Sequence, residues 1–171
     1  MADALTRLVV DCSVVVKWKI PTEDHAAAAA ALLGDWEQQV VDVWVPNHFP
    51  SEVISAFLRA ARRSRLTTDE AREAIQDLLA LPFVLCDVTT LADRAFTLAH
   101  QRQQRAYDCL YVALAEQDGS ELWTGDERLY NALHAQHPLV RWIADYQPRW
   151  SGGLGQRHSS QRSSVVSPPI Q

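Results

Sequence analysis

Residues 5–18 read LTRLVVDCSVVVKW, an apolar run that meets an acidic residue and then continues into a second apolar run. Leu5 to Val10 has the continuous apolar character of a buried strand. Asp11 follows this strand directly, and Ser13 is suited to cap a short helix that ends before Pro21. A strand that leads straight into a helix favours an α/β fold. A carboxylate at the end of so apolar an element needs a polar or charged partner.

Strand and helix patterns alternate along the rest of the chain. The expected strands are 40–45, 83–88, 122–124 and 139–143, and the expected helices are 22–38, 52–64 (capped by Ser51), one from Thr67 or Thr68 to before Pro82, 91–102, 107–117 and 127–135. Strands separated by helical patterns predict a parallel sheet with helices on both faces. The predicted fold class is therefore a three-layer α/β/α sandwich with a central, mainly parallel sheet of about five strands.

Composition favours one globular domain and excludes several classes. The 171 residues are 47% hydrophobic and 22% charged, as in an ordinary folded domain. The 21 acids against 16 bases, a net charge of -5, argue against a protein that wraps duplex DNA. No apolar run is long enough to cross a bilayer, so no membrane partner is expected. The start lacks a signal-peptide pattern, and three cysteines without a Cys/His cluster favour the cytoplasm.

The composition changes near residue 149. Residues 1–148 carry the alternating patterns and are predicted to form the folded domain. Residues 149–171 are rich in Ser, Gly and Pro, and such a segment buries too little apolar surface to offset its ordering entropy. We therefore expect a disordered tail there.

Four acids stand where strands end or helices begin: Asp11, Glu52, Asp108 and Asp126. In a parallel sheet these positions share the edge beyond the carboxyl ends of the strands. Taken singly, an acid in the first turn of a helix also has an ordinary role in complementing the helix dipole. As a set, clustered carboxylates repel one another unless a cation is bound. Oxygen-only ligands favour Mg²⁺, with Mn²⁺ as a substitute.

Four segments carry a resemblance to a known family. They are VVDCSVVVKW at 9–18, PSEV at 50–53, YDCLYVALA at 107–115 and WTGDERL at 123–129. In content and order they resemble the four motifs of PIN-domain proteins, over roughly residues 7–145. The length of the chain and the residues of the motifs resemble those of the bacterial VapC toxins. Cys12 and Cys109 depart from the pattern, since many relatives have alanine there.

The resemblance implies a PIN-like sandwich and a Mg²⁺-dependent endoribonuclease, the toxin of a type II toxin–antitoxin pair. It cuts single-stranded or loop regions of RNA with metal-activated water, leaving a 5′-phosphate and a 3′-hydroxyl. By resemblance, Asp11, Glu52, Asp108 and Asp126 are catalytic, Asp11, Asp108 and Asp126 hold the metal, and Ser13 and Thr124 support them. The implied partners are RNA, a cognate antitoxin and a second copy of the chain in a homodimer.

Basic and aromatic residues are candidates for RNA contacts. Arg59, Arg62, Arg63 and Arg65 follow one another at the end of the 52–64 helix, with Lys17 and Lys19 near the first motif as weaker candidates. They either bind phosphates or complement the helix dipole. Trp18 and Trp123 either stack on bases or pack in the core, and core packing is favoured.

The helix from 52 and the one that follows form a pair between two strands. Its apolar positions are Val53, Ile54, Phe57, Leu58 and Ala61, then Ala71, Ala74, Ile75, Leu78 and Leu79. The pair either clamps an antitoxin helix or packs as a simple layer of the domain.

Other functions fit the sequence less well. An aspartyl phosphatase needs a second acid two residues after the first, where Ser13 stands, and a receiver domain needs adjacent acids and a late lysine, whereas no Lys follows Lys19. A PIN-fold module that binds RNA or a partner without cutting remains an alternative, as does a housekeeping RNA-processing nuclease.

Overall fold

The computed structural model describes residues 5–150 of the chain. It contains a five-stranded sheet of order β3-β2-β1-β4-β5, in which every pair of neighbours is parallel. The strands are β1 (Thr6–Val10), β2 (Val41–Pro46), β3 (Val84–Cys86), β4 (Glu121–Thr124) and β5 (Val140–Trp142). The predicted α/β sandwich is confirmed. The predicted disordered tail lies almost wholly outside the described residues and stays a prediction.

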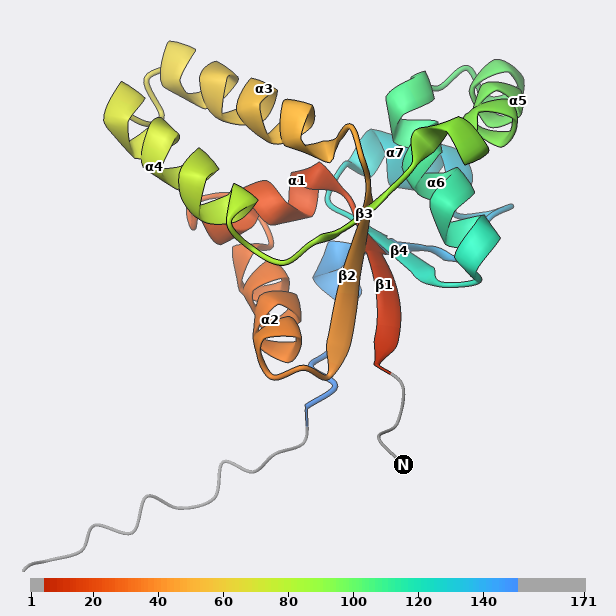
Figure 1. The fold of residues 1–171 in the computed structure, drawn as a ribbon, viewed down its shortest axis with the longest axis horizontal. Coiled ribbons are helices and arrows are strands. Elements are labelled where there is room, and N and C mark those ends of the chain that lie inside the picture. Colours follow the sequence, from red (N-terminus) through yellow and green to blue (C-terminus); the bar gives the residue numbers. More distant parts are fainter. Residues whose placement is uncertain (1–4, 151–171) are drawn as a thin grey trace, which may run out of the picture.

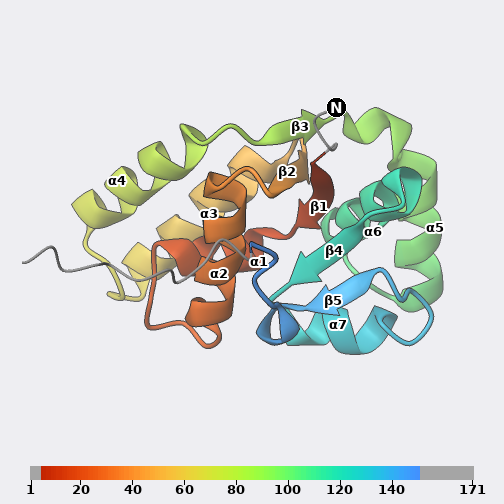
Figure 2. The ribbon, with the colours of Figure 1, turned by 90° about the horizontal axis from the view of Figure 1, so that it is seen from below.

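Helices cover both faces of the sheet. They are α1 (Cys12–Val15), α2 (Ala26–Glu37), α3 (Phe49–Arg62), α4 (Thr68–Leu79), α5 (Ala92–Arg102), α6 (Ala106–Asp118) and α7 (Glu127–Leu133). Helix α6 packs on β1, β2 and β4, and α5 covers α6, while α2 packs on the opposite face of β2 (Figure 2). None of the helices in residues 5–150 is both long and apolar enough to cross a membrane.

Strand β1 lies at the centre of the sheet and sets its register. Leu8, Val9 and Val10 are buried, and Val9 is paired with Trp44 on one side and Leu122 on the other. The Asp11 amide continues this ladder by donating to the Trp123 carbonyl at 3.0 Å. The carboxyl ends of β1 and β4 therefore lie side by side, and the residues that follow them emerge at one edge.

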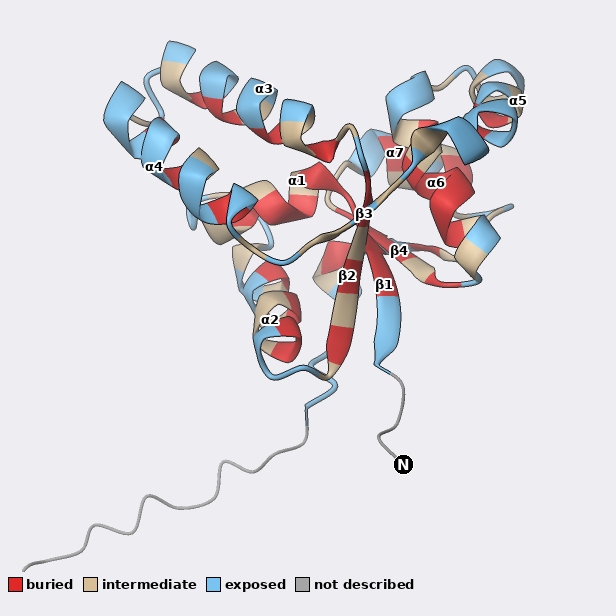
Figure 3. Ribbon diagram, in the orientation of Figure 1, coloured by how far each residue is buried: buried red, intermediate tan, exposed pale blue. Residues whose placement is uncertain are grey.

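Helices α3 and α4 form a hairpin, here called the arm (residues 49–79), that projects from the body of the molecule (Figure 1). Phe57, Ala74 and Leu78 are buried between its helices, whereas the outer faces are exposed (Figure 3). Ile54 and Leu58 were expected on the buried stripe but are 47% and 45% exposed. The apolar stripe of α3 is therefore wider than the surface that α4 and the body cover.

Some predicted boundaries were wrong for local reasons. Helix α3 begins at Phe49, before the expected cap Ser51, because Pro50 suits a first helical turn. Helix α2 begins only after His25, whose φ of 62° interrupts the expected helix from residue 22. Strand β3 stops at Cys86 because the Asp87 carboxylate accepts hydrogen bonds from the Thr89 amide and hydroxyl and turns the backbone.

Candidate active site

A cleft of about 730 Å³ opens at the carboxyl edge of the sheet, between the arm and α6. Four segments each bring one acid to its lining: the end of β1, the first turn of α3, the first turn of α6 and the cap of α7. These acids are the predicted ones, Asp11, Glu52, Asp108 and Asp126. We call this space the acid cleft. The sequence prediction that the four would meet at one edge agrees with their positions.

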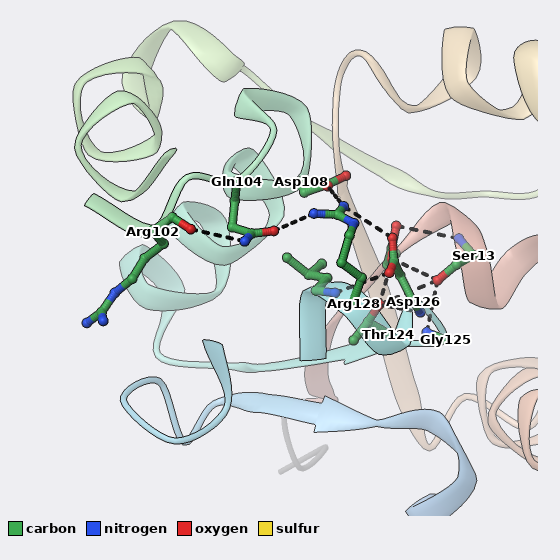
Figure 4. A network of polar contacts seen from close by, with 10 residues as sticks. Ser13, Arg102, Gln104, Asp108, Thr124, Gly125, Asp126 and Arg128 are labelled. Atoms are coloured by element: carbon green, nitrogen blue, oxygen red, sulfur yellow. Dashed lines mark hydrogen bonds and ion pairs between the residues drawn. The ribbon is translucent and has the colours of Figure 1, made fainter. Parts of the chain in front are cut away.

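Asp11 is the most buried of the four and is held by hydroxyl groups. Its Oδ2 accepts hydrogen bonds from Ser13 Oγ and from Thr124 Oγ1, both at 2.7 Å. Thr124 Oγ1 also accepts from the Asp126 amide at 3.0 Å, and Ser13 Oγ accepts from the Gly125 amide at 2.9 Å (Figure 4). This network ties the end of β1 to the end of β4. Ser13 and Thr124, the residues expected to support the acids, thus both bond to Asp11. The expected cap was wrong, since Asp11 caps α1 and Ser13 lies inside that helix.

Burial raises the pKa of Asp11 to about 6. The Thr124 and Ser13 hydroxyls oppose this rise, and the nearby charges of Glu52 and Asp108 add to it. Hydroxyl donors favour the ionised form but supply no positive charge. The carboxylate at the centre of the acid cleft is thus fixed in place while its charge remains incompletely balanced.

Asp108 and Asp126 are joined by an arginine. Arg128 Nη2 lies 2.5 Å from Asp108 Oδ2 and 3.4 Å from Asp126 Oδ2 (Figure 4). Its other terminal nitrogen donates to the Gln104 side chain, which in turn donates to the Arg102 carbonyl. Burial raises the pKa of Asp108, and the hydrogen bond from Arg128 counteracts the rise. The guanidinium therefore stands where a cation shared by these two carboxylates would be expected.

Glu52 is oriented by aromatic residues that the sequence analysis did not single out. Tyr111 Oη donates to Glu52 Oε2 at 2.5 Å, and His48 Nε2 lies 3.3 Å from the same oxygen. Tyr111 is fully buried, and burial raises its pKa well above the usual value, so the phenol stays a donor. Tyr111 lies one helical turn after Asp108, the spacing that could have revealed it.

Basic residues also line the acid cleft. Arg59, Arg63, Arg65 and Arg105 line it, whereas the predicted Arg62 is not part of the described lining. Lys17 also lines the cleft, but its side chain is only 6% exposed. Its Nζ lies 3.5 Å from Glu23 Oε2, and the Glu23 carboxylate also binds Arg65. A Cβ added at Gly125 would stand 2.6 Å from Lys17 Cε. The lysine side chain therefore passes close to the Cα of residue 125, and any larger residue there would require it to shift.

Comparison with known proteins identifies the family. Residues 8–133 match the family model described as the PIN domain, which is well over half of the chain. The chain belongs to the PIN domain family. Ribonuclease VapC3 from Mycobacterium tuberculosis is 32% identical over 133 residues, covering 78% of this chain and 92% of the relative. The predicted resemblance is therefore confirmed.

Two solved structures share the fold of this PIN domain. A toxin–antitoxin complex from Klebsiella pneumoniae superposes with a TM-score of 0.55 at 15% identity, over 80% of this chain and 97% of the other. VapC20 from Mycobacterium tuberculosis, a sarcin-ricin loop cleaving toxin, gives 0.55 at 18% identity, over 74% and 95%. At such identities the likeness establishes the fold alone.

The tryptophans near the motifs of this PIN domain pack in its core. Trp18 stacks on Phe83 with ring centroids 6.2 Å apart, and its indole nitrogen donates to the Ala29 carbonyl at 2.8 Å. Trp123 is 6% exposed and packs edge-on against Tyr146. Core packing, the favoured of the two interpretations, agrees with these contacts.

The two unusual cysteines are buried beside the acids. Burial raises the pKa of the Cys109 thiol to about 11 and that of Cys12 further still. Thiols of this kind are protonated and weakly reactive at neutral pH. Both side chains pack in the core of the PIN domain, and Cys12 also lines the acid cleft as a protonated thiol.

The oxygen-rich donor set fits a hard divalent cation chemically. Within residues 5–150, however, no three His, Cys, Asp or Glu side chains lie close enough together to hold one as they stand. Arg128 bridges two of the acids, and Glu52 faces Tyr111 and His48. A cation shared by Asp108 and Asp126 would take the place that Arg128 occupies between them.

Proposed function

We propose that this PIN domain is a Mg²⁺-dependent endoribonuclease and the toxin of a type II toxin–antitoxin pair. The observation that carries the proposal is the acid cleft, which four carboxylates and four arginines line together. The acids suit a cation, and the arginines suit the phosphates of a polyanion. The relatives named ribonuclease VapC support the same activity.

Asp11, Asp108 and Asp126 are the residues that would hold the metal ion. Asp11 has an unbalanced buried charge, and Asp108 and Asp126 already share one cationic group. When bound, Mg²⁺ supplies charge neutralisation at the phosphate and lowers the pKa of water.

The chain's own residues supply orientation. Tyr111 donates a hydrogen bond to Oε2 of Glu52 and so orients this carboxylate, and His48 Nε2 lies 3.3 Å from the same oxygen. A carboxylate so held is suited to orient a water molecule or to accept its proton. Arg59 and Arg63, one turn apart on α3, are suited to bind the RNA phosphates on either side of the cleaved bond. Attack by water without the ribose 2′-OH leaves a 5′-phosphate and a 3′-hydroxyl.

The proposed regulatory partner is a small antitoxin. The exposed Ile54, Leu58 and Leu79 of the arm offer apolar surface for a partner helix. A partner Arg or Lys placed among the four acids would balance their charge without activating water. The expected homodimer is a further proposal, and sedimentation of the purified protein tests it.

The test is RNA cleavage by the purified protein in Mg²⁺, in EDTA and after Mg²⁺ is restored. We expect products with 5′-phosphates, no cleavage in EDTA and none by Asp11→Asn. Asp69→Asn is the matched control, because Asp69 is an exposed acid on α4 with a side chain 94% exposed, and it should cut normally.

The outcomes separate the alternatives. Cleavage that persists in EDTA contradicts the metal mechanism. RNA that binds but is never cut favours the binding module. Co-expression with the product of a small neighbouring gene tests the toxin assignment, since cleavage with no inhibitory partner and no toxicity favours a housekeeping nuclease.

A further inference from the structure

We propose that Tyr107 is a stacking subsite for one unpaired nucleobase next to the cleaved phosphate. The inference rests on the proposed function, because it names the residue through which the acid cleft selects single-stranded RNA. Sequence reasoning offered Trp18 and Trp123 for this role, and the structure uses both in the core.

Tyr107 is a large aromatic side chain placed at the rim of the acid cleft. It lies in the first turn of α6 beside Asp108, lines the cleft and is 63% exposed. A ring this exposed gains little from packing in its own chain. Tyr107 and Asp108 are neighbours in this turn, and both line the acid cleft.

The ring of Tyr107 is supported from behind. Its centroid is 5.4 Å from that of His48, and His48 packs edge-on against the fully buried Tyr111 at 5.5 Å. His48 also contacts Glu52, so the same imidazole touches the rim aromatic and a cleft acid. This support limits the motion of Tyr107 and lowers the entropy lost when a ligand stacks on it.

The charge around Tyr107 favours a nucleic acid over a protein side chain as the occupant. Arg59, Arg63 and Arg105 line the same cleft, and Arg105 is two residues before Tyr107. Arginines that bind phosphates next to an exposed aromatic ring make up the usual site for single strands. In a duplex the bases are already stacked and paired, so only an unpaired base can reach the ring.

The chain contains a matched control for this residue. Phe96 on α5 is 70% exposed and stacks on His100 with ring planes 3° apart, but it is not among the described residues that line the acid cleft. Tyr107 and Phe96 are thus both exposed rings that lean on a histidine, and they differ in being inside or outside the cleft.

The experiment measures binding of a single-stranded RNA that carries one 2-aminopurine, and of a blunt-ended RNA duplex of the same length, to the full chain in EDTA. We expect Tyr107→Ala to weaken single-strand binding about tenfold and to abolish quenching of 2-aminopurine, because stacking is lost. Tyr107→Phe should stay within about twofold, as should Phe96→Ala. Binding of the duplex should change in none of them.

Several results would overturn the subsite. One is unchanged binding and quenching by Tyr107→Ala, and another is equal weakening of binding to the single strand and to the duplex. If Tyr107→Ala binds RNA normally but no longer binds a protein inhibitor, Tyr107 contacts the inhibitor and not a nucleobase. If the wild type cuts single strands and Tyr107→Ala does so with unchanged KM, only the subsite fails. If the wild type neither binds nor cuts RNA, the proposed function fails as well.

Discussion

Asp11 and Asp108 are carboxylates of the same cleft, yet different kinds of group bind to them. Asp11 is 7% exposed and is held by two hydroxyl donors. Asp108 is held by the guanidinium of Arg128 at 2.5 Å. Burial raises the pKa of both groups, but only at Asp108 does an ion pair counteract it. Hydroxyls fix a position without balancing charge, whereas an arginine balances charge and must move before another cation can bind.

The largest expected effect is on metal affinity. We predict that Asp11→Asn weakens Mn²⁺ binding by more than about 100-fold. Removing a group that supports a ligand weakens metal binding by about 10- to 100-fold, and removing the ligand itself should weaken it more. Asp108→Asn should weaken binding less, about tenfold, because Arg128 already neutralises part of that charge. Calorimetric titration with Mn²⁺ measures both, with Asp69→Asn as the unchanged control. Equal losses for the two variants would remove the distinction between these carboxylates.

The second effect is on stability in the absence of metal. The folded-state pKa of Asp11 is about 6, above its usual 3.8, so the folded protein holds this proton more tightly than the unfolded chain. Stability contributed by Asp11 is therefore present at low pH and is lost as the pH rises from about 4 through 6. We predict that the stability of Asp11→Asn relative to wild type increases by about 2 kcal/mol between pH 4 and 8.

Urea unfolding in EDTA at a series of pH values measures this difference. Asp69→Asn serves as the control, since its exposed carboxyl has no comparable burial. If the difference in unfolding free energy between Asp11→Asn and wild type does not change with pH, burial does not destabilise the ionised form of Asp11.

The third prediction concerns the hydroxyl that fixes Asp11. Thr124→Val keeps the shape of the side chain but removes the donor to Asp11 and the acceptor of the Asp126 amide. We predict that metal affinity and cleavage fall about 10- to 100-fold. Thr97→Val is the matched control, because its hydroxyl donates only to a carbonyl within exposed α5. Affinity within twofold of wild type would mean that burial alone positions Asp11.

The smallest effect is expected at Arg128. Because its guanidinium must leave Asp108 and Asp126 before a cation binds there, Arg128→Gln should bind Mn²⁺ about fivefold more tightly. Arg94→Gln is the control, since Arg94 pairs with Glu116 away from the cleft and should leave metal affinity unchanged. Weaker binding by Arg128→Gln would show that the arginine organises the acids for metal rather than competing with it.

The sequence was sufficient for the order of strands and helices and for the meeting of the acids. Apolar runs such as Leu8 to Val10 mark central strands, and parallel strands place Asp11 and Asp126 at one edge by geometry alone. The roles of Arg128 and Tyr107 could not be predicted this way. Arg128 meets Asp108 across 20 residues of sequence, and the exposure of Tyr107 depends on what packs around it.

The apolar pattern also failed where burial depends on neighbours. Ile54 and Leu58 share the period of Val53 and Phe57, yet only the latter two are buried. Helical periodicity gives the direction of an apolar stripe but not how much of its width another element covers.

The passage of Lys17 across Gly125 makes the two positions genetically interdependent. An alanine at 125 would meet Lys17 Cε, so the lysine side chain would have to shift, and its 3.5 Å ion pair with Glu23 would shift with it. The same substitution would be nearly silent in a background where residue 17 is short. Positions 125 and 17 are therefore epistatic. An uncharged substitution at 125 moves the charge of Lys17, and the residue present at 17 determines which substitutions position 125 tolerates.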